Sequence, residues 1–500
     1  MGAFEMDRRK FCKTTLAASV AASLPVLTAC GKKAPVATEA EASIRAVSLD
    51  GAELELSKSM IRELGDAMTG PVILSEHPDY DGSRKIWNGM HDKRPALIAR
   101  CLTSEDVSNA VNFARDHGLL TAVRGGGHSW PGKSICDDGI VVDLSHMTNV
   151  EIDAENKIGM TAGGALLGHL DDAALAQGLV TTAGVVSHTG VGGYTTGGGF
   201  GRLNRKYGLT IDNLRGAEIV TADGQVRYIS AEQEPDLFWA IRGGGGNFGA
   251  VTRFDFQLHE FDRNIFSGMI VWPVEQAREV LEFYAEWQGT LSRELYTGPA
   301  MITHPELGHV IAMEVVYNGD PAQGEKEIAP LRAIGKPVVD GVMMQDYKVM
   351  QTQEDAMLAH GIRSYAKNAM IGDFSQSLVD DLVESYIADP RAGIFTHTCG
   401  GAVADYSATD TSFPHRDTQT MIVFFTGWMD PAEDEIGKQM CRDWHAALEQ
   451  HSLGYYDNIE QDGDTRVARN FGPNYERLRE IKATYDPGNQ FRLNSNIEPA

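Results

Sequence analysis

The chain has 500 residues, of which 42% are apolar and 23% are charged, a composition typical of ordinary globular proteins. Because this length exceeds one ordinary hydrophobic core, we expect two or three packed units, one of which can be discontinuous in sequence. A formal net charge of −25 repels nucleic acids and anionic lipid surfaces, and the sequence shows no basic face with interleaved aromatic residues. These properties exclude a nucleic-acid partner.

Residues 1–29 are typical of an export signal. A basic stretch, DRRKFCK at 7–13, precedes a short apolar run at 14–29, and the chain then becomes polar. The apolar run is interrupted by Pro25 and is too short to cross a bilayer as a stable helix. We therefore expect the body of the protein to be exported to the periplasm or cell envelope.

Two details indicate the route of export. Arg8 and Arg9 resemble the pair of a twin-arginine signal, and LTAC at 27–30 resembles a lipobox that ends at Cys30. A lipid on Cys30 would tether the body through a polar linker over 30–48, and it is the only membrane contact that we expect. The alternative is an ordinary secretory signal in which Cys30 is incidental.

Four cysteines lie in the body, at Cys101, Cys136, Cys399 and Cys441. Their wide spacing differs from that of a disulfide framework, and no C-x-x-C pair indicates zinc binding or redox exchange. Spacing alone leaves one or two disulfides open. No H-E-x-x-H motif or comparable histidine cluster occurs, so no metal is expected.

Residues 96–265 alternate short β-rich runs with helical patterns. Thr103 or Ser104 would cap the first helix, and Asp223-Gly224 would turn a hairpin. The pattern predicts strands at 96–102, 119–127, 139–147 and 250–261, helices at 103–118 and 165–178, and a hairpin at 209–230. This α+β pattern is not the repeated βαβ of a doubly wound fold. A Rossmann motif also fails in detail, because we expect no helix after the glycine loops and find no acidic ribose ligand about twenty residues on.

The sequence pattern changes near residue 266. Residues 266–450 are predicted to form a second domain, an antiparallel sheet backed by helices. Strands are predicted at 267–274, 308–319 and 420–430, and amphipathic helices at 274–289, 375–388 and 433–451. The last segment, 451–500, contains a short helix closed by Asp486-Pro487-Gly488.

Glycine concentrates in four segments, at 125–127, 163–164, 190–201 and 243–249. Glycine loses more backbone entropy on folding than other residues, so such runs weaken a fold unless the backbone must approach something closely. Consecutive N–H groups that face one way can bind a pyrophosphate. The alternative, a set of flexible linkers, conflicts with the Val, Ile and Phe runs beside these segments. The glycines therefore predict a site for a large dinucleotide.

Four stretches, in this order, resemble the berberine-bridge-enzyme-like FAD-linked oxidases, which have the vanillyl-alcohol-oxidase and p-cresol-methylhydroxylase flavoprotein fold. They are residues 94–129 (ending in RGGGHS), 189–214 (beginning TGVGGYTTGGGFG), 242–259 (RGGGGNFGAVTRFDFQLH) and 485–497 (YDPGNQFRLNSNI). The resemblance runs from about residue 85 to the C-terminus. It implies an α+β fold in which a two-part FAD-binding domain, 49–265 plus the C-terminal segment 451–500, carries an inserted substrate domain at 266–450.

The same resemblance implies how FAD is held. His128 matches the histidine that family members bond to the flavin 8α-methyl group. Some members add a cysteinyl bond, but that position here is Val186, so we expect a single covalent link. The other positions that match FAD-binding residues are Arg124, Gly125, Gly126, Gly127, Ser129, Thr189, Gly190, Gly192, Gly193, Gly197, Gly198, Gly199, Gly201, Gly249, Val251, Asn458, Asn494 and Asn496.

Oxidation at the flavin needs hydride delivery to N5 and, for an alcohol or phenol, a base for the O–H proton. Tyr456, in the family's Y-x-N segment with Asn458, is the leading base candidate, although a packing or substrate-stacking role is the alternative. Its pKa, about 10 when free, would have to be lowered by a nearby cation or by hydrogen-bond donors. Tyr194 and Tyr365 are further catalytic candidates, and Lys367, His397, His415 and Arg416 are expected at the substrate pocket.

The expected function is that of an FAD-dependent oxidoreductase that acts on a hydroxyl-bearing or phenolic small molecule. Thr189 falls at the family position associated with oxygen access, which favours an oxidase that forms hydrogen peroxide. The first alternative is a dehydrogenase that passes electrons to a quinone or a carrier protein. The second is a non-catalytic envelope lipoprotein that binds a ligand. The sequence does not identify the substrate.

Overall fold

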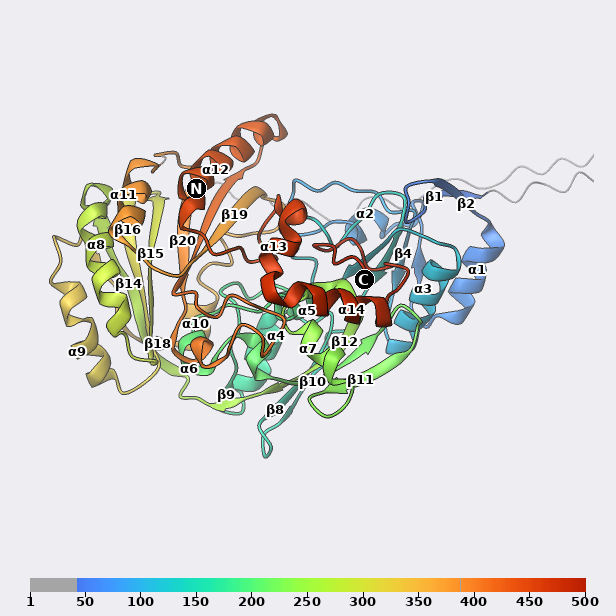
Figure 1. Ribbon diagram of the computed structural model, residues 1–500, viewed down its shortest axis with the longest axis horizontal. Helices are drawn as coiled ribbons and strands as arrows, with labels where there is room; N and C mark the ends of the chain where they lie inside the picture. The colour runs from blue at the N-terminus through green and yellow to red at the C-terminus, as the bar shows by residue number, and fades with distance from the viewer. Residues whose placement is uncertain (1–42, 387) are drawn as a thin grey trace, which may run out of the picture. The chain divides into compact units, whose positions relative to one another are not determined.

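The computed structural model describes residues 43–500 except residue 387, so the export signal, Cys30 and most of the expected linker lie outside the described residues. No helix in the described part of the chain is long and apolar enough to span a membrane. The described chain begins with a hairpin, β1 (Ile44–Val47) and β2 (Glu53–Leu56), and helix α1 (Lys58–Ala67). Figure 1 shows the order of the elements that follow.

A small mixed sheet carries the first glycine loop. Its four strands follow the order β3 (Val72–Ile73), β4 (Leu97–Arg100), β6 (Ile140–Asp143) and β5 (Thr121–Arg124). β4 and β5 both pair with β6 in parallel, and helix α3 (Ser104–Asp116) connects them. Thr103 caps this helix by accepting the Asp106 N–H, which confirms the prediction. Because β5 ends at Arg124, the glycine loop 125–127 begins at the carboxyl end of an edge strand.

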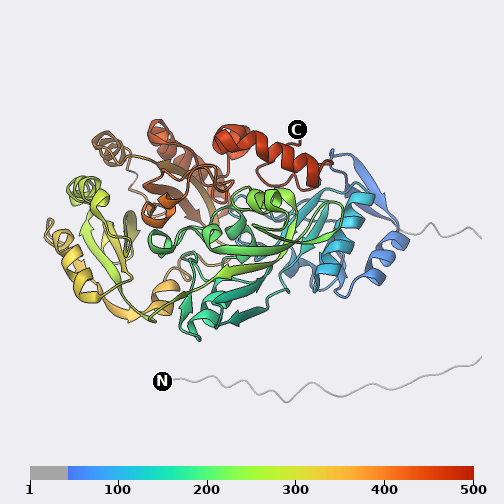
Figure 2. The same cartoon turned by 60° about the horizontal axis from the view of Figure 1, so that its bottom comes forward.

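A second sheet, antiparallel throughout, supports the other glycine segments. Its order is β11 (Val226–Ser230), β10 (Leu214–Val220), β12 (Ala250–Gln257), β8 (Ile158–Ala162) and β7 (Val150–Asp153). The predicted hairpin is confirmed as β10 and β11, with Gly224 in its turn at φ +74°. Helices α4 (Leu167–Leu175), α7 (Pro235–Ile241) and α14 (Tyr475–Tyr485) share one hydrophobic core with this sheet. The C-terminal α14 lies beside α7 in both views (Figures 1 and 2).

One prediction in this part is wrong. The third glycine segment, 190–201, contains a short helix, α5 (Val191–Thr196), with Gly190 as its N-cap residue. Two glycines and two threonines make the local helix propensity poor, which is why the sequence does not reveal it. Val191, Thr195 and Thr196 are buried, so tertiary packing holds the turn. The short helix α6 (Asn204–Tyr207) and the paired strands β9 (Leu179–Val180) and β13 (His259–Glu260) complete this region.

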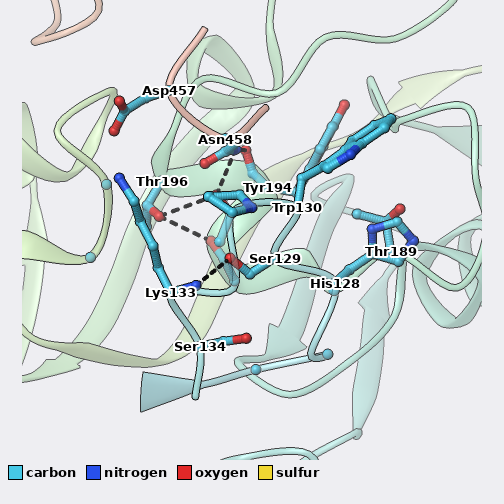
Figure 3. A pocket seen from close by; sticks show the side chains of 18 of the residues that line it. His128, Ser129, Trp130, Lys133, Ser134, Thr189, Tyr194, Thr196, Asp457 and Asn458 are labelled. Carbon is cyan, nitrogen blue, oxygen red and sulfur yellow. Dashed lines mark hydrogen bonds between the residues drawn. The ribbon is translucent and has the colours of Figure 1, made fainter. Parts of the chain in front are cut away.

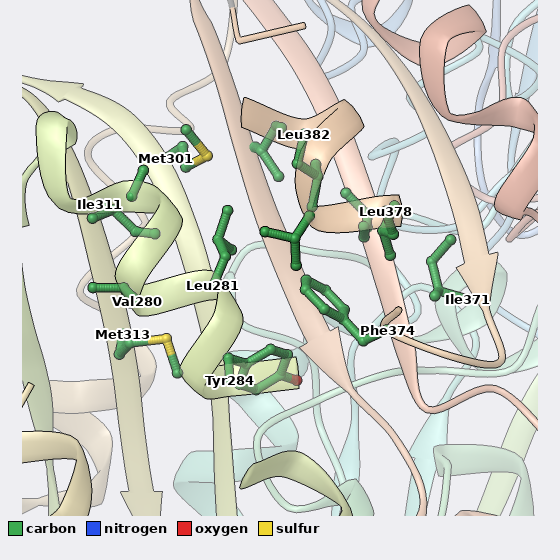
Figure 4. Close-up of a cluster of buried hydrophobic side chains, with 14 of the residues drawn as sticks. Val280, Leu281, Tyr284, Met301, Ile311, Met313, Ile371, Phe374, Leu378 and Leu382 are labelled. Atoms are coloured by element: carbon green, nitrogen blue, oxygen red, sulfur yellow. The ribbon is translucent and has the colours of Figure 1, made fainter. Parts of the chain in front are cut away.

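A large antiparallel sheet forms from residues 264–428. Its order is β17 (Val339–Asp340), β14 (Asn264–Pro273), β16 (Gly308–Tyr317), β15 (Leu295–His304), β20 (Ala392–Thr398), β21 (Thr420–Trp428) and β19 (Arg363–Ile371), and β18 (Met343–Asp346) also pairs with β14. Helices α8 (Ala277–Trp287), α11 (Gln376–Glu384) and α12 (Asp434–Leu448) confirm the predicted helices. Figure 4 shows apolar side chains of α8, α11 and the sheet in one core.

The two faces of this sheet have different partners, because successive residues of a strand point to opposite faces. Ile394 on β20 and Ile422 on β21 belong to the core beneath the helices. Met421 and Val423, also on β21, face the other way and belong to a core that includes Phe200. That second face borders the cavity described next.

Candidate active site

One cavity is lined by three parts of the chain that are far apart in sequence. The first part comprises loops and strand ends between residues 121 and 251, the second contributes Leu358, Phe395, His397 and Met421, and the third comprises residues 456–459 and 491–495. Figure 3 shows side chains of the loop at 128–134, of α5 and of the C-terminal segment around it. The cavity therefore forms only after all three parts have folded together.

Glycines allow the loops that line this cavity to pack backbone against backbone. A Cβ atom on Gly126 would overlap the Gly190 Cα, and Gly127 has φ +68°, where other residues are strained. Gly193 also lines the cavity, and a Cβ atom there would meet no atom within 4 Å beyond its chain neighbours and the backbone of its own helix. The predicted FAD-binding residues that line the cavity are Gly125, Gly126, Gly127, His128, Ser129, Thr189, Gly190, Gly192, Gly193, Gly249, Val251, Asn458 and Asn494.

Other predicted FAD-binding residues lie behind the lining. Gly197 packs against the Asn458 side chain, and Gly201 packs against the Ala183 backbone. Gly198 and Gly199 have φ of +136° and +84°, values that favour glycine, in the bend that follows α5. The Arg124 guanidinium bonds to the Ser83 carbonyl oxygen instead of facing the cavity. Residues that the structure does not place in the lining are Arg124, Gly197, Gly198, Gly199, Gly201 and Asn496.

His128 is partly buried at one end of the glycine loop, and its Nε2 atom is fully buried. Its ring stacks on Trp87, with centroids 4.4 Å apart and planes at 15°, and its Nε2 has no hydrogen-bond partner among the residues that the structure describes. Burial, reinforced by the neighbouring rings of His188 and His360, lowers the pKa of His128 to about 3. The imidazole is therefore neutral near pH 7, with one unprotonated ring nitrogen.

The lining also holds buried polar atoms with no partner within the described chain. The indole N–H of Trp130 and the hydroxyl of Ser134 are two such atoms, and His128 Nε2 is a third. Unpaired buried polar groups are costly, so these atoms fit a bound molecule that carries several polar groups of its own. The sequence reasoning missed Trp87, Trp130 and Ser134, although Trp130 follows His128 by only two positions.

Tyr456 lines the cavity, but its hydroxyl already makes hydrogen bonds within the protein. It accepts the Gly199 N–H at 3.2 Å and the Asn458 amide N–H at 2.8 Å, and it lies 3.4 Å from the Tyr194 carbonyl oxygen, to which it donates. None of these partners is charged, so of the two expected alternatives, a cation or hydrogen-bond donors, these bonds of the hydroxyl supply the donors. Burial raises the pKa of Tyr456 well above its usual value.

Tyr194 also lines the cavity with its ring while its hydroxyl bonds elsewhere. That hydroxyl donates to the Phe200 carbonyl oxygen at 2.8 Å and accepts from the Thr210 hydroxyl at 3.1 Å. Burial raises its pKa strongly. These bonds fix the bend after α5, so the contacts support a positioning role and not a catalytic one.

The sequence predicts Tyr365 and Lys367 at the site, but both point to the other face of β19. Tyr365 donates to Asp462, and Lys367 pairs with Glu460 at 2.7 Å. Alternate residues of a strand point to opposite faces of the sheet, so Tyr365 and Lys367 lie on the face that packs against α12. Ala366, between them, lies on the face toward the cavity. Their expected catalytic and pocket roles are corrected accordingly.

His415 and Arg416 are also outside the lining. His415 Nε2 bonds to Asn470 Oδ1 at 2.9 Å. Arg416 makes two bonds of 2.8 Å to the Asp212 carboxylate, and both side chains are buried. These contacts are structural, which leaves His397 as the one predicted pocket residue of the four that the structure brings to the cavity.

Comparison with known proteins agrees with this geometry. Residues 95–230 match a family model described as an FAD-binding domain, and residues 453–498 match one described as berberine and berberine-like. An FAD-linked oxidoreductase of Dictyostelium discoideum is 32% identical over 88% of this chain and 97% of its own length. The (R)-6-hydroxynicotine oxidase of Paenarthrobacter nicotinovorans is 31% identical over 87% and 97%.

The fold points to the same group. A crystal structure of 6-hydroxy-D-nicotine oxidase from Arthrobacter nicotinovorans covers 87% of this chain and 98% of its own, with 30% identity and a TM-score of 0.79. A chitooligosaccharide oxidase, 23% identical with a TM-score of 0.79, shares the fold. The chain belongs to the berberine-bridge-enzyme-like family of FAD-linked oxidoreductases.

Proposed function

We propose that this oxidoreductase is an FAD-dependent oxidase that oxidises a hydroxyl-bearing or phenolic small molecule and passes the electrons to oxygen, forming hydrogen peroxide. The observation that carries the proposal is a cavity that is lined both by the glycine loop ending at His128 and by the aromatic side chains of Phe200 and Phe395. Relatives named as oxidases support it, as does the small Thr189 side chain in the lining. When bound, FAD accepts a hydride from the substrate carbon.

The residues of the chain supply the rest of the chemistry. The glycine backbones at 125–127 and 190–193 would hold the pyrophosphate. Phe200, Phe395 and Met421 would exclude water from the reacting end. A polar group in that wall must then receive the proton that leaves the substrate hydroxyl.

We propose further that His128 is the only covalent tether of the flavin. Its unpartnered Nε2 and neutral ring support this role. Val186 lines the cavity where some family members carry a cysteine, and none of the four described cysteines is in the lining. The lining thus offers a histidine at position 128 for a bond to the flavin, and no cysteine at position 186 for a second bond.

Substitution of His128 tests the tether. His128→Ala is expected to release all of its flavin into the supernatant after acid precipitation, whereas the wild-type pellet stays yellow. His188→Ala is the matched control, since His188 is a neighbouring histidine whose ring centroid lies 5.1 Å from that of His128, and its flavin should stay in the pellet. Acid-stable flavin in His128→Ala would show that another residue forms the bond.

Reoxidation tests the electron acceptor. The substrate-reduced enzyme should be reoxidised by dissolved oxygen within seconds in a stopped-flow trace, with one hydrogen peroxide formed per flavin. Reoxidation over many minutes in air, together with rapid reoxidation by a quinone, would instead establish the dehydrogenase. This experiment uses the wild-type enzyme alone, so its outcome is read separately from that of the His128 substitution.

We propose export by the twin-arginine route and lipidation of Cys30 on the basis of residues 8–9 and 27–30. A route that carries folded proteins suits a chain that takes up a cytoplasmic cofactor. Fractionation of cells that express the Arg8→Lys, Arg9→Lys variant should find the protein in the cytoplasm. Undiminished export of that variant would exclude the route.

A further inference from the structure

His397 occupies a distinctive place in the cavity. It lies on the central strand β20 and is only 6% exposed, yet it lines the cavity. Its ring centroid is 6.1 Å from that of Phe200 and 5.6 Å from that of Phe395. A polar ring is therefore set in an aromatic wall.

The hydrogen bonds of His397 determine which ring nitrogen is available. The Tyr296 hydroxyl lies 2.9 Å from His397 Nδ1 and 3.3 Å from the Thr396 carbonyl oxygen. We assign the single hydroxyl proton of Tyr296 to the carbonyl, which can only accept, so that Nδ1–H of His397 donates to Tyr296; the opposite tautomer, with Tyr296 donating to Nδ1, would place the ring proton on Nε2. This arrangement leaves Nε2 unprotonated, and Nε2 has no hydrogen bond to any described residue. A lone pair is thus offered to a ligand.

The charges around His397 keep the ring neutral. Arg202 is buried nearby and pairs with Glu314 at 2.7 Å and with Glu354 at 3.3 Å, and Tyr296 faces the ring from β15. Burial, followed by the Arg202 charge, lowers the pKa of His397 to about 3. An unprotonated acceptor is therefore present throughout the neutral range.

We propose that His397 Nε2, and not Tyr456, receives the hydroxyl proton of an aromatic substrate that lies against Phe200 and Phe395. The substrate O–H bond breaks and an N–H bond forms on His397, while the carbon–hydrogen bond breaks as a hydride leaves with two electrons for FAD and a carbonyl forms. Tyr456 would first have to ionise, and its hydroxyl already has three partners. The inference rests on the proposed function, which supplies FAD as the hydride acceptor and a hydroxyl group on the substrate.

Binding of 4-nitrophenol tests the acceptor without turnover. The neutral phenol should perturb the flavin absorbance of the wild-type holoenzyme, and its affinity should fall as the ligand ionises, because the anion has no proton to donate to Nε2. His397→Phe should weaken binding of the neutral phenol by about tenfold or more, the effect of one lost hydrogen bond in a desolvated site. Tyr456→Phe should change it by less than about threefold.

Three outcomes of the titration would overturn the proposal. They are no binding to wild type, tighter binding of the anion, and a loss confined to Tyr456→Phe. His415→Gln controls for removal of a buried histidine, since His415 is 9% exposed but outside the lining. Acid precipitation of the same samples measures separately whether the flavin is covalently bound. The titration can therefore be interpreted even if the flavin proves not to be covalently bound to His128.

Anaerobic reduction by 4-hydroxybenzyl alcohol tests the proton transfer. The wild-type rate should be level from about pH 5 to 9, because His397 stays neutral there. His397→Gln should lower the rate about 100-fold, and Tyr456→Phe by less than about tenfold. A rate that rises continuously with pH and vanishes in Tyr456→Phe would assign the base to Tyr456. Reduction by cellobiose and not by the aromatic alcohol would overturn the substrate class.

Discussion

Asp171, in α4, is a buried carboxyl group with an oxygen that has no hydrogen-bond partner in the described chain. Burial raises its pKa to about 7. The folded protein thus keeps a proton that the unfolded chain, with a pKa of about 4, has released. The stability that this group contributes is complete below about pH 4 and is lost progressively as the pH rises to about 7.

Asp171→Asn should remove this loss. Between pH 5 and pH 8 the wild type should lose about 3 kcal/mol more free energy of unfolding than the variant does, as measured by denaturant titration at both pH values. Asp172→Asn is the control, because Asp172 is exposed and pairs with Lys348. Parallel pH dependences for wild type and Asp171→Asn would show that Asp171 is ionised in the folded protein.

Sequence reasoning places single residues at the cavity when a motif fixes the backbone around them. His128 and Asn458 both lie in short motifs, and both line the cavity. It does not predict hydrogen bonds to distant partners: His397 lines the cavity as expected, but its bond to Tyr296 joins residues 101 positions apart. Arg416 shows the converse, because its charge suggests a ligand while its partner, Asp212, is 204 positions away.

At the scale of elements, the sequence predicts helices well where a cap and an apolar stripe agree. α3 begins after Thr103 as expected, and α12 buries the residues of one face. It misses β15, in which Gly298-Pro299 is typical of a turn although the strand pairs on both sides. It also cannot say which face of β19 is buried, since polar Lys367 and apolar Ala366 are both buried there. Neighbouring strands, which the local pattern does not contain, decide these points.

The contact between the loop at 125–127 and α5 yields a paired prediction. Gly126→Ala would force its methyl group into the Gly190 backbone, so we expect a lower melting temperature and no bound flavin. Gly193→Ala should leave the apoprotein as stable or up to about 1 kcal/mol more stable, because alanine favours a helix, yet reduce flavin content, since the methyl group enters the cavity. Differential scanning calorimetry and flavin absorbance separate the two effects. Equal behaviour of the two variants would contradict this assignment.

At the scale of the molecule, the C-terminal segment closes the cavity made by the earlier chain. Lys482 and Asp486 form a fully buried ion pair, and Lys482 also donates to the Asn247 carbonyl oxygen at 2.6 Å. The Asn247 side chain bonds in turn to the Ser495 carbonyl oxygen. The resemblance to the family predicts this return of the chain. Local patterns show only a short helix there, because they contain no information on its partner.

Deletion of residues 489–500 should abolish flavin binding. It removes Phe491, Leu493, Asn494 and Ser495 from the lining while α14 remains. The purified variant should be colourless, with near-native far-ultraviolet circular dichroism. Deletion of 499–500 alone is the control and should retain flavin, since neither residue is in the lining. A yellow 489–500 deletion would show that the earlier chain suffices.

The four described cysteines are free and buried, and burial raises the pKa of each thiol. Among the residues that the structure describes, no disulfide contributes to the fold. Folding of this part of the chain therefore does not depend on the redox potential of the solution. Residues 43–500 can reach this fold equally in a reducing and in an oxidising solution. Its thiols are shielded from oxidants for as long as the native state persists.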